Sequence, residues 1–180
     1  MLSPKAKTGR SYYRYLRNTN VQWNRFELTD LAQMDFSPAE RAKFALRSGD
    51  LLVCEGGEPG RCAVWRGEID DCYFQKALHR VRPFEGKADS DFLCAWIRHQ
   101  AFSGAFVDQN AKTTIAHLPQ VRLEKLGVPD VGIDEQRRIA LRLRKQLAEA
   151  DAIAKAAAEQ LAEIERLPQR LFARAFGEAS

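Results

Sequence analysis

The feature that most constrains the fold is a segment, residues 133–167, that contains no glycine, no proline and no aromatic residue. Glycine and proline are the residues least favourable inside a helix, so nothing in this segment interrupts one. Asp134 is a good N-cap, and Glu135 suits the positive end of a helix dipole. The sequence therefore predicts one helix of about 33 residues, ~50 Å long, that ends before Pro168.

An apolar stripe runs along this predicted helix. Its members recur at alternating spacings of four and three residues, which is the heptad pattern of a coiled coil. A helix of this length cannot bury such a stripe against itself, so we expect it to pack on another helix or on a second copy. The alternative is that the stripe packs on the globular part of the same chain. The residues of the stripe, called the seam below, are Leu143, Leu147, Ala150, Ala154, Ala157, Leu161 and Ile164.

Charges along the predicted helix are distributed against its dipole. A helix dipole favours acidic residues at the N-terminal end and basic residues at the C-terminal end, whereas here the order is reversed. A second copy running antiparallel would place each half against its opposite charge. We therefore predict a homodimer formed through antiparallel helices. The basic residues are Arg137, Arg138, Arg142, Arg144 and Lys145, and the acidic ones are Glu159, Glu163 and Glu165.

A different structure is encoded before this helix, because 15 of the 17 aromatic residues lie in positions 1–106. Residues 51–54 and 63–65 predict a hairpin around a glycine-rich turn, and alternating apolar and polar residues predict strands at 78–83 and 121–124. Ser90 is expected to cap a helix over residues 91–100. Its inward side chains are expected to be Phe92, Ala95, Trp96 and Phe102.

These elements define an α+β fold with two parts. A small mixed α/β domain is expected over residues 1–130. The long coiled-coil helix is expected within residues 131–180, for dimerisation and partner docking. After Pro168, a short apolar stripe of Leu171, Phe172, Ala175 and Phe176, closed by Gly177, predicts a second docking surface.

Positive charge is concentrated at the N-terminal end. Residues 1–25 contain six basic residues and no acidic one, whereas the rest of the chain has 22 basic and 24 acidic residues. Tyr12, Tyr13, Tyr15 and Trp23 are interleaved with these cations, a combination suited to phosphate pairing and contact with bases or sugars. The alternative is a solvated strand whose tyrosines face a core.

No residue pattern indicates an active site. The glycine-rich segment 55–61 lacks the Gly-Lys-Ser/Thr of a phosphate-binding loop, and Asp70-Asp71 indicates a turn. The three histidines are scattered, and the four cysteines form no Cys-x-x-Cys, so we predict reduced thiols and no metal site. We therefore expect a protein that is not itself an enzyme. Without an apolar leader or a membrane span, we expect it in the cytoplasm.

Five segments, in order, together resemble the specificity subunit of type I restriction-modification enzymes. The first three resemble the strands and glycine turn of a target recognition domain, the fourth resembles the entry to the conserved helical region, and the fifth resembles the family's ending. The Pro-x-Pro usual before the fourth segment is replaced here by Pro129-Asp130-Val131-Gly132-Ile133. The segments are Tyr15 to Val21, Leu46 to Val53 with Glu55-Gly56-Gly57 and Gly60-Arg61, Phe74 to Arg82, Val128-Pro129 with Glu135 to Ile139, and Leu171 to Gly177.

The resemblance implies a non-catalytic subunit that reads one half of a bipartite double-stranded DNA target. It implies as partners a modification subunit, which carries S-adenosylmethionine and methylates adenine, and a restriction subunit. This chain itself is expected to bind no cofactor. Because it has one recognition unit where the family normally has two, it is either a half-length subunit acting as a homodimer or a fragment of a longer one.

DNA contacts are predicted at surface and loop positions with basic or polar side chains, because such groups pair with phosphates and base edges. The alternative function is a protein–protein adaptor in which the long helix docks a partner and no DNA is read. The predicted contact residues are Lys7, Arg10, Tyr12, Arg14, Arg61, Lys112 and Thr113.

Overall fold

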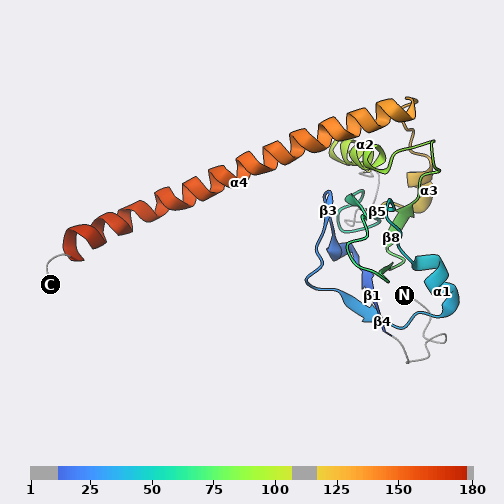
Figure 1. The fold of residues 1–180 in the computed structure, drawn as a ribbon, viewed down its shortest axis with the longest axis horizontal. Helices are drawn as coiled ribbons and strands as arrows, with labels where there is room; N and C mark the ends of the chain where they lie inside the picture. The colour runs from blue at the N-terminus through green and yellow to red at the C-terminus, as the bar shows by residue number, and fades with distance from the viewer. Residues whose placement is uncertain (1–11, 107–116, 178–180) are drawn as a thin grey trace. The chain divides into compact units, whose positions relative to one another are not determined.

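The computed structural model describes residues 12–106 and 117–177 and contains two compact units, of which the first ends at Ala140 and the second begins at Leu141. The predicted α+β class is confirmed, with short strands followed by a long C-terminal helix (Figure 1). The strands are β1 (Tyr13–Leu16), β2 (Val21–Gln22), β3 (Arg25–Phe26), β4 (Ala32–Met34), β5 (Leu51–Cys54), β6 (Cys62–Val64), β7 (Tyr73–Phe74) and β8 (Leu78–Val81). The helices are α1 (Pro38–Phe44), α2 (Ser90–Phe102), α3 (Gln120–Glu124) and α4 (Ile133–Gly177), with a 3-10 turn at Asn18–Asn20.

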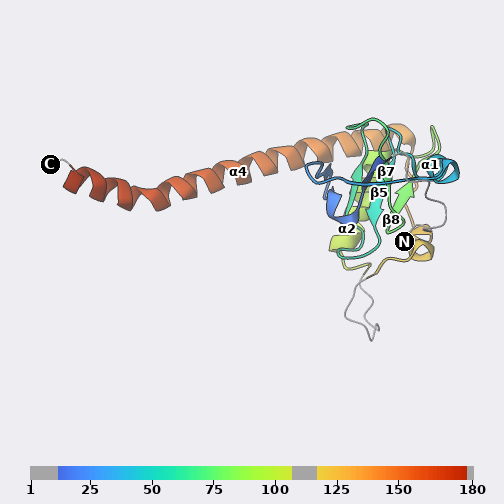
Figure 2. The same ribbon diagram turned by 90° about the horizontal axis from the view of Figure 1, so that it is seen from below.

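The sheet β6-β5-β8 is antiparallel and lies at the centre of the first unit (Figure 2). The predicted hairpin is confirmed, because Leu51 pairs with Val64 and Val53 with Cys62 on either side of the glycine turn. A second sheet has the order β4-β1-β7, with β1 antiparallel to β4 and parallel to β7. Strands β2 and β3 form a separate hairpin.

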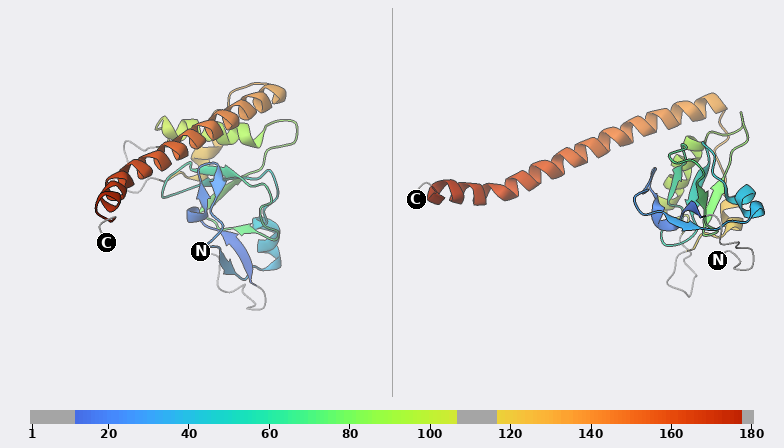
Figure 3. Two further views of the ribbon diagram at one scale, coloured as in Figure 1. Left: turned by 60° about the vertical axis from the view of Figure 1, so that its left-hand side comes forward. Right: turned by 60° about the horizontal axis from the view of Figure 1, so that its bottom comes forward.

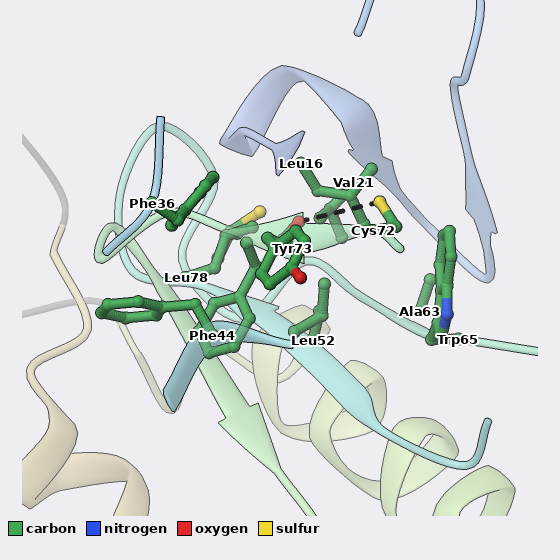
Figure 4. Close-up of a cluster of buried hydrophobic side chains, with 12 residues drawn as sticks. Leu16, Val21, Phe36, Phe44, Leu52, Ala63, Trp65, Cys72, Tyr73 and Leu78 are labelled. Carbon is green, nitrogen blue, oxygen red and sulfur yellow. Dashed lines mark hydrogen bonds between the residues drawn. The ribbon is translucent and has the colours of Figure 1, made fainter. Parts of the chain in front are cut away.

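All four residues of β5 are buried, because the central sheet has a hydrophobic core on each face. Successive side chains of a strand point to opposite faces. Leu52 therefore enters the first core, which also contains Trp65, Phe44 and Tyr73 (Figure 4). Leu51 enters the second core, which the helix α2 covers with Phe92, Leu93 and Ile97. Both faces being covered explains why β5 lacks the apolar–polar alternation of a half-exposed strand.

The start of α4 belongs to the second core. Gln136 and Ala140 are buried, and Ile139 packs beside them. The Gln136 side chain accepts a hydrogen bond from the backbone N–H of Asp89 and donates one to the carbonyl of Val131, at 3.0 and 2.9 Å. This polar side chain therefore ties the beginning of α4 to the beginning of α2.

Three sequence predictions about these elements are wrong in detail. Residues 120–124 form the helix α3 and no strand, because Pro119 precedes them with a φ suited to a helix start and four residues of alternation carry little information. The N-cap of α2 is Asp89, whose carboxylate accepts the Phe92 N–H, while the Ser90 hydroxyl donates to the carbonyl of Gly49. Phe102 is 64% exposed and does not point inward.

The long helix also differs from its predicted bounds. It begins at Ile133, so Asp134 lies in its first turn, and it continues through Pro168 to Gly177. Proline removes one backbone hydrogen bond and crowds the preceding turn, which bends a helix without necessarily ending it. The C-terminal part of α4, drawn in red, changes direction in Figures 2 and 3. The stripe expected to follow a break is therefore part of the same helix.

All four cysteines are buried and unpaired, as predicted. Burial raises the pKa of Cys72 from 9.0 to about 11. A group whose pKa is higher in the folded protein stabilises it below the unfolded pKa, and this stabilisation is lost as the pH rises toward the folded value.

We therefore expect the free energy of unfolding to fall as the pH rises from 9.0 to about 11, because the unfolded chain ionises first. Urea unfolding curves recorded across this range measure the effect. The variant Cys72→Ala should show a smaller pH dependence, and an identical dependence in both proteins would contradict the assignment.

Candidate nucleic-acid interface

At β1, the tyrosines and the arginine near the N-terminus divide into two that are exposed and two that pack on the core. Arg14 is exposed and sits opposite Gln33 of β4, and Tyr12, just before the strand, is 66% exposed. Tyr13 and Tyr15 pack against the first core, each in edge contact with Phe36. The alternative interpretation, tyrosines facing a core, therefore holds for these two, while Tyr12 and Arg14 remain available to a ligand.

Four of the seven predicted DNA contacts cannot be placed. Lys7, Arg10, Lys112 and Thr113 lie outside the described residues. The described residues resume after Lys112 and Thr113 at His117, which forms an isolated β-bridge with Gly56 of the glycine turn.

Arg61 lies directly after the glycine turn, but its guanidinium is engaged within the protein. It donates to the carbonyl of Asn18 at 2.9 Å and to Glu58 at 3.1 Å, and its side chain is 18% exposed. These bonds hold the segment around Asn18 against the turn. Arg61 therefore stabilises the contact between the glycine turn and the segment around Asn18. Its guanidinium is less accessible to a phosphate than the sequence predicted.

A partly exposed cluster of two rings and one guanidinium was not predicted from the sequence. The rings of Trp23, at the tip of the β2–β3 hairpin, and Phe102, at the end of α2, have centroids 4.9 Å apart. The guanidinium of Arg98 lies 5.9 Å from the Trp23 ring and 5.3 Å from the Phe102 ring. The spacing of Arg98 and Phe102 on one helix face could have indicated this pair. No local signal places Trp23 beside them.

Glu58 and the glycine turn connect this cluster to Arg61. The indole N–H of Trp23 donates to one oxygen of Glu58 at 2.8 Å, and Arg61 donates to the other. Gly60 has a φ of +88°, and a Cβ there would lie 2.6 Å from the ring of Phe106. The positive φ and the close approach of the turn to Phe106, which follows α2, therefore require glycine at this position.

Three arginines, Arg47, Arg82 and Arg137, line a hollow of about 300 Å³ near the start of α2. Arg82 donates two hydrogen bonds to the carboxylate of Asp50, at 2.6 and 2.7 Å, and this bonding raises the pKa of Arg82. Arg47 and Arg137 lie at the same hollow, with Phe84 exposed at 83%. Asp50 is buried, so Arg82 is mainly structural. Arg47 and Arg137 are exposed, and Arg137 forms a surface ion pair with Asp134 at 3.6 Å.

The described part of the first unit offers exposed positive charge and an exposed aromatic ring. Arg14, Arg25 and Arg98 can neutralise phosphates, and the exposed Phe102 ring offers an apolar face. Within residues 12–106 and 117–177 no three His, Cys, Asp or Glu side chains are grouped to hold a metal ion. In the same ranges no helix has the length and apolar character needed to cross a membrane.

Part of this sequence is similar to two curated proteins. No family model matches the chain. The type I restriction enzyme EcoDI specificity subunit of Escherichia coli is 30% identical over 94 residues, which are 52% of this chain and 21% of that protein. The EcoBI specificity subunit of Escherichia coli is 28% identical over 131 residues, 73% of this chain and 27% of that protein. The chain thus matches only about a quarter of the length of these relatives.

Solved structures share the fold. A chain of a type I R-M system, from a structure concerned with complex assembly and conformational transition, superimposes with a TM-score of 0.71 over 98% of this chain and 41% of that chain, at 18% identity. The HsdS subunit from Thermoanaerobacter tengcongensis superimposes with a TM-score of 0.64 over 91% of this chain and 43% of that subunit, at 16% identity.

Proposed function

Starting from the homology of this chain with type I restriction enzyme specificity subunits, we propose that it reads one half of a bipartite DNA target for such an enzyme. The observation that carries the proposal is the agreement of sequence and fold. Relatives of that name match in sequence, and a globular unit with the same long helix recurs in solved structures of the class. The chain spans less than half of those structures, so a second reader must come from another chain or from further sequence.

The positive side chains of the first unit supply a physical basis for DNA binding. Arg14, Arg25 and Arg98 are positioned by two strands and a helix, and each can pair with a phosphate. Phosphate contacts fix the position of a protein on DNA, while base edges are read by side chains that enter a groove. We assign base reading to loops next to the Trp23–Phe102–Arg98 cluster, because the hairpin tip and the glycine turn meet there.

The chemistry belongs to partners in this proposal. A modification subunit would bind S-adenosylmethionine and methylate adenine, and a restriction subunit would cleave. This chain would bind no cofactor, and it would act in the cytoplasm, where the DNA is. Pairing of two chains through the seam, antiparallel, would place two readers in a homodimer at a spacing set by the helix.

Selection of bound fragments from random DNA by the chain reconstituted with its modification subunit tests the proposal. A twofold symmetric dimer recognises two inverted copies of one half-site at a fixed gap, because target symmetry follows protein symmetry. We expect enrichment of such an inverted repeat. Absence of any enriched sequence would contradict the proposal and favour an adaptor without DNA readout.

Charge reversal at Arg14 and Arg98 should weaken DNA binding for all sequences. Each lost phosphate contact is expected to reduce the slope of log affinity against log salt by about 1. Binding isotherms at several salt concentrations measure both effects. Lys76→Glu is the control for each single reversal, because it makes the charge change of one of them at an exposed turn between β7 and β8. Equal slopes for the double variant and the wild-type protein would remove these arginines from the interface.

A further inference from the structure

The C-terminal end of α2 presents an aromatic ring that is exposed and yet held in place. Phe102 is 64% exposed. The ring of Trp23 lies 4.9 Å from it at a tilt of 36°, and the guanidinium of Arg98 lies 5.3 Å from its centroid. A ring that its neighbours already hold loses little conformational freedom when a partner covers it. The open part of Phe102 is therefore preorganised for contact.

The ring that supports Phe102 is itself anchored. The indole N–H of Trp23 donates to Glu58 at 2.8 Å, and the indole packs against the second core. The next residue, Asn24, has a φ of +59° and donates its backbone N–H to the carbonyl of Cys62 in β6 at 3.0 Å. The Asn24 side chain accepts a hydrogen bond from the α2 thiol 3.5 Å away. The hairpin tip is thus tied to both β6 and α2.

Positive charge lies beside the ring, but the end of the helix does not favour a phosphate. Arg98 belongs to the same helix, and Arg25 follows the hairpin tip with a side chain that is 69% exposed. The C-terminal end of a helix carries partial negative charge, which repels phosphate oxygens. We therefore expect DNA phosphates at the two arginines and an uncharged group of the DNA at Phe102.

The chemistry and the packing of the ring restrict which uncharged group it can contact. An aromatic ring lacks the donors and acceptors that read polar base edges, and the apolar group on the base edges of the major groove is the C5-methyl of thymine. Apolar side chains can also enter between two stacked bases. That position requires two open faces, whereas Trp23 partly covers one face of Phe102. Contact with a methyl group needs only the open side.

We propose that Phe102 contacts the C5-methyl group of one thymine in the half-site, with Trp23 and Arg98 holding the ring in position. The contact selects thymine over the other bases at that position. The inference rests on the proposed function, because it assigns one base contact to the surface that the cluster forms.

Replacement of thymine by deoxyuridine tests the contact, because deoxyuridine lacks the methyl group and keeps the same pairing edge. The half-site is first selected from random DNA by the chain reconstituted with its modification subunit, and every thymine on either strand is then replaced in turn. At one position the wild-type protein should bind about fourfold more weakly, the effect of one lost methyl contact. Phe102→Ala should bind the two DNAs equally well. A half-site without such a thymine, or equal sensitivity in the variant, overturns the contact.

Phe84→Ala is the matched control. Phe84 is 83% exposed, and it lines the hollow at the opposite, N-terminal end of α2, about 18 Å along the helix from Phe102. This variant should distinguish thymine from deoxyuridine as the wild-type protein does. If it also loses this discrimination, the effect does not come from the Phe102 ring, and the contact is overturned.

Salt dependence separates the ring from a phosphate contact. Phe102→Ala should leave the slope of log affinity against log salt unchanged, because no phosphate pairing is lost. A smaller slope would place Phe102 at the DNA backbone and overturn the contact. An enriched target without a methyl-sensitive thymine overturns the contact alone and leaves the proposed function standing, whereas the absence of any enriched target overturns both.

Discussion

If the chain forms the proposed antiparallel dimer, replacement of Leu147 and Leu161 by glutamate is expected to give monomers. In an antiparallel pair of identical helices each substitution occurs once in each copy, so four carboxylates would enter the seam between apolar neighbours. Burying an unpaired charge is costly, and about 4 kcal/mol in total corresponds to about a thousandfold weaker association. Sedimentation equilibrium measures the mass.

The same substitutions on the opposite side of the helix provide the control. Ala148→Glu with Ala152→Glu adds equal charge at exposed positions away from the seam, and it should leave the mass unchanged. DNA selection should then separate the two proteins, because a monomer can enrich a single half-site and a dimer an inverted repeat. An unchanged mass for the seam variant would remove the antiparallel-dimer prediction.

Replacement of Arg82 by methionine is expected to give the largest loss of stability among single surface-accessible positions. The carboxylate of Asp50 is buried, and apart from Arg82 it accepts a hydrogen bond from the backbone N–H of Arg47 at 2.8 Å. Removing the partner of a buried charge costs about 3 kcal/mol or more. Because the Arg82 side chain is 37% exposed, we expect the lower end of that range. Urea unfolding measures the change.

Two further variants separate the buried pair from ordinary surface charge. Arg66→Met removes an ion pair with Asp91 whose side chains are both partly exposed, and it should cost about 1 kcal/mol or less. The double variant Asp50→Asn with Arg82→Met removes the buried charge as well, so it should recover part of the stability. Equal losses for Arg66→Met and Arg82→Met would contradict the structural role of Asp50.

The elements with strong periodicity were predictable, and those that depend on distant contacts were not. The hairpin around the glycine turn and the long helix follow from turn residues and from uninterrupted helix formers. The strand predicted at 121–124 is the helix α3, because a short apolar–polar alternation fits either structure. The bounds of α4 were missed at Pro168, where an established helix tolerates one lost hydrogen bond.

The candidate interface shows the same division. An excess of cations near the N-terminus is visible in the sequence, and Tyr12 and Arg14 are exposed as expected. The internal role of Arg61 depends on the carbonyl of Asn18, 43 residues away in the chain. The cluster of Trp23, Arg98 and Phe102 joins a hairpin tip to the end of a helix, and no local pattern relates those two segments.

By itself, the sequence determined the class of fold, the position of the long helix α4, the heptad seam along this helix and the family that the chain resembles. These properties depend on residue types at short, regular spacings, because backbone geometry repeats every 3.6 residues in a helix and every two in a strand. Only the tertiary structure decided which cations are free, which are tied to carboxylates or carbonyls, and which aromatic rings meet. Those contacts join residues far apart in the chain, and their positions follow from how the two cores pack.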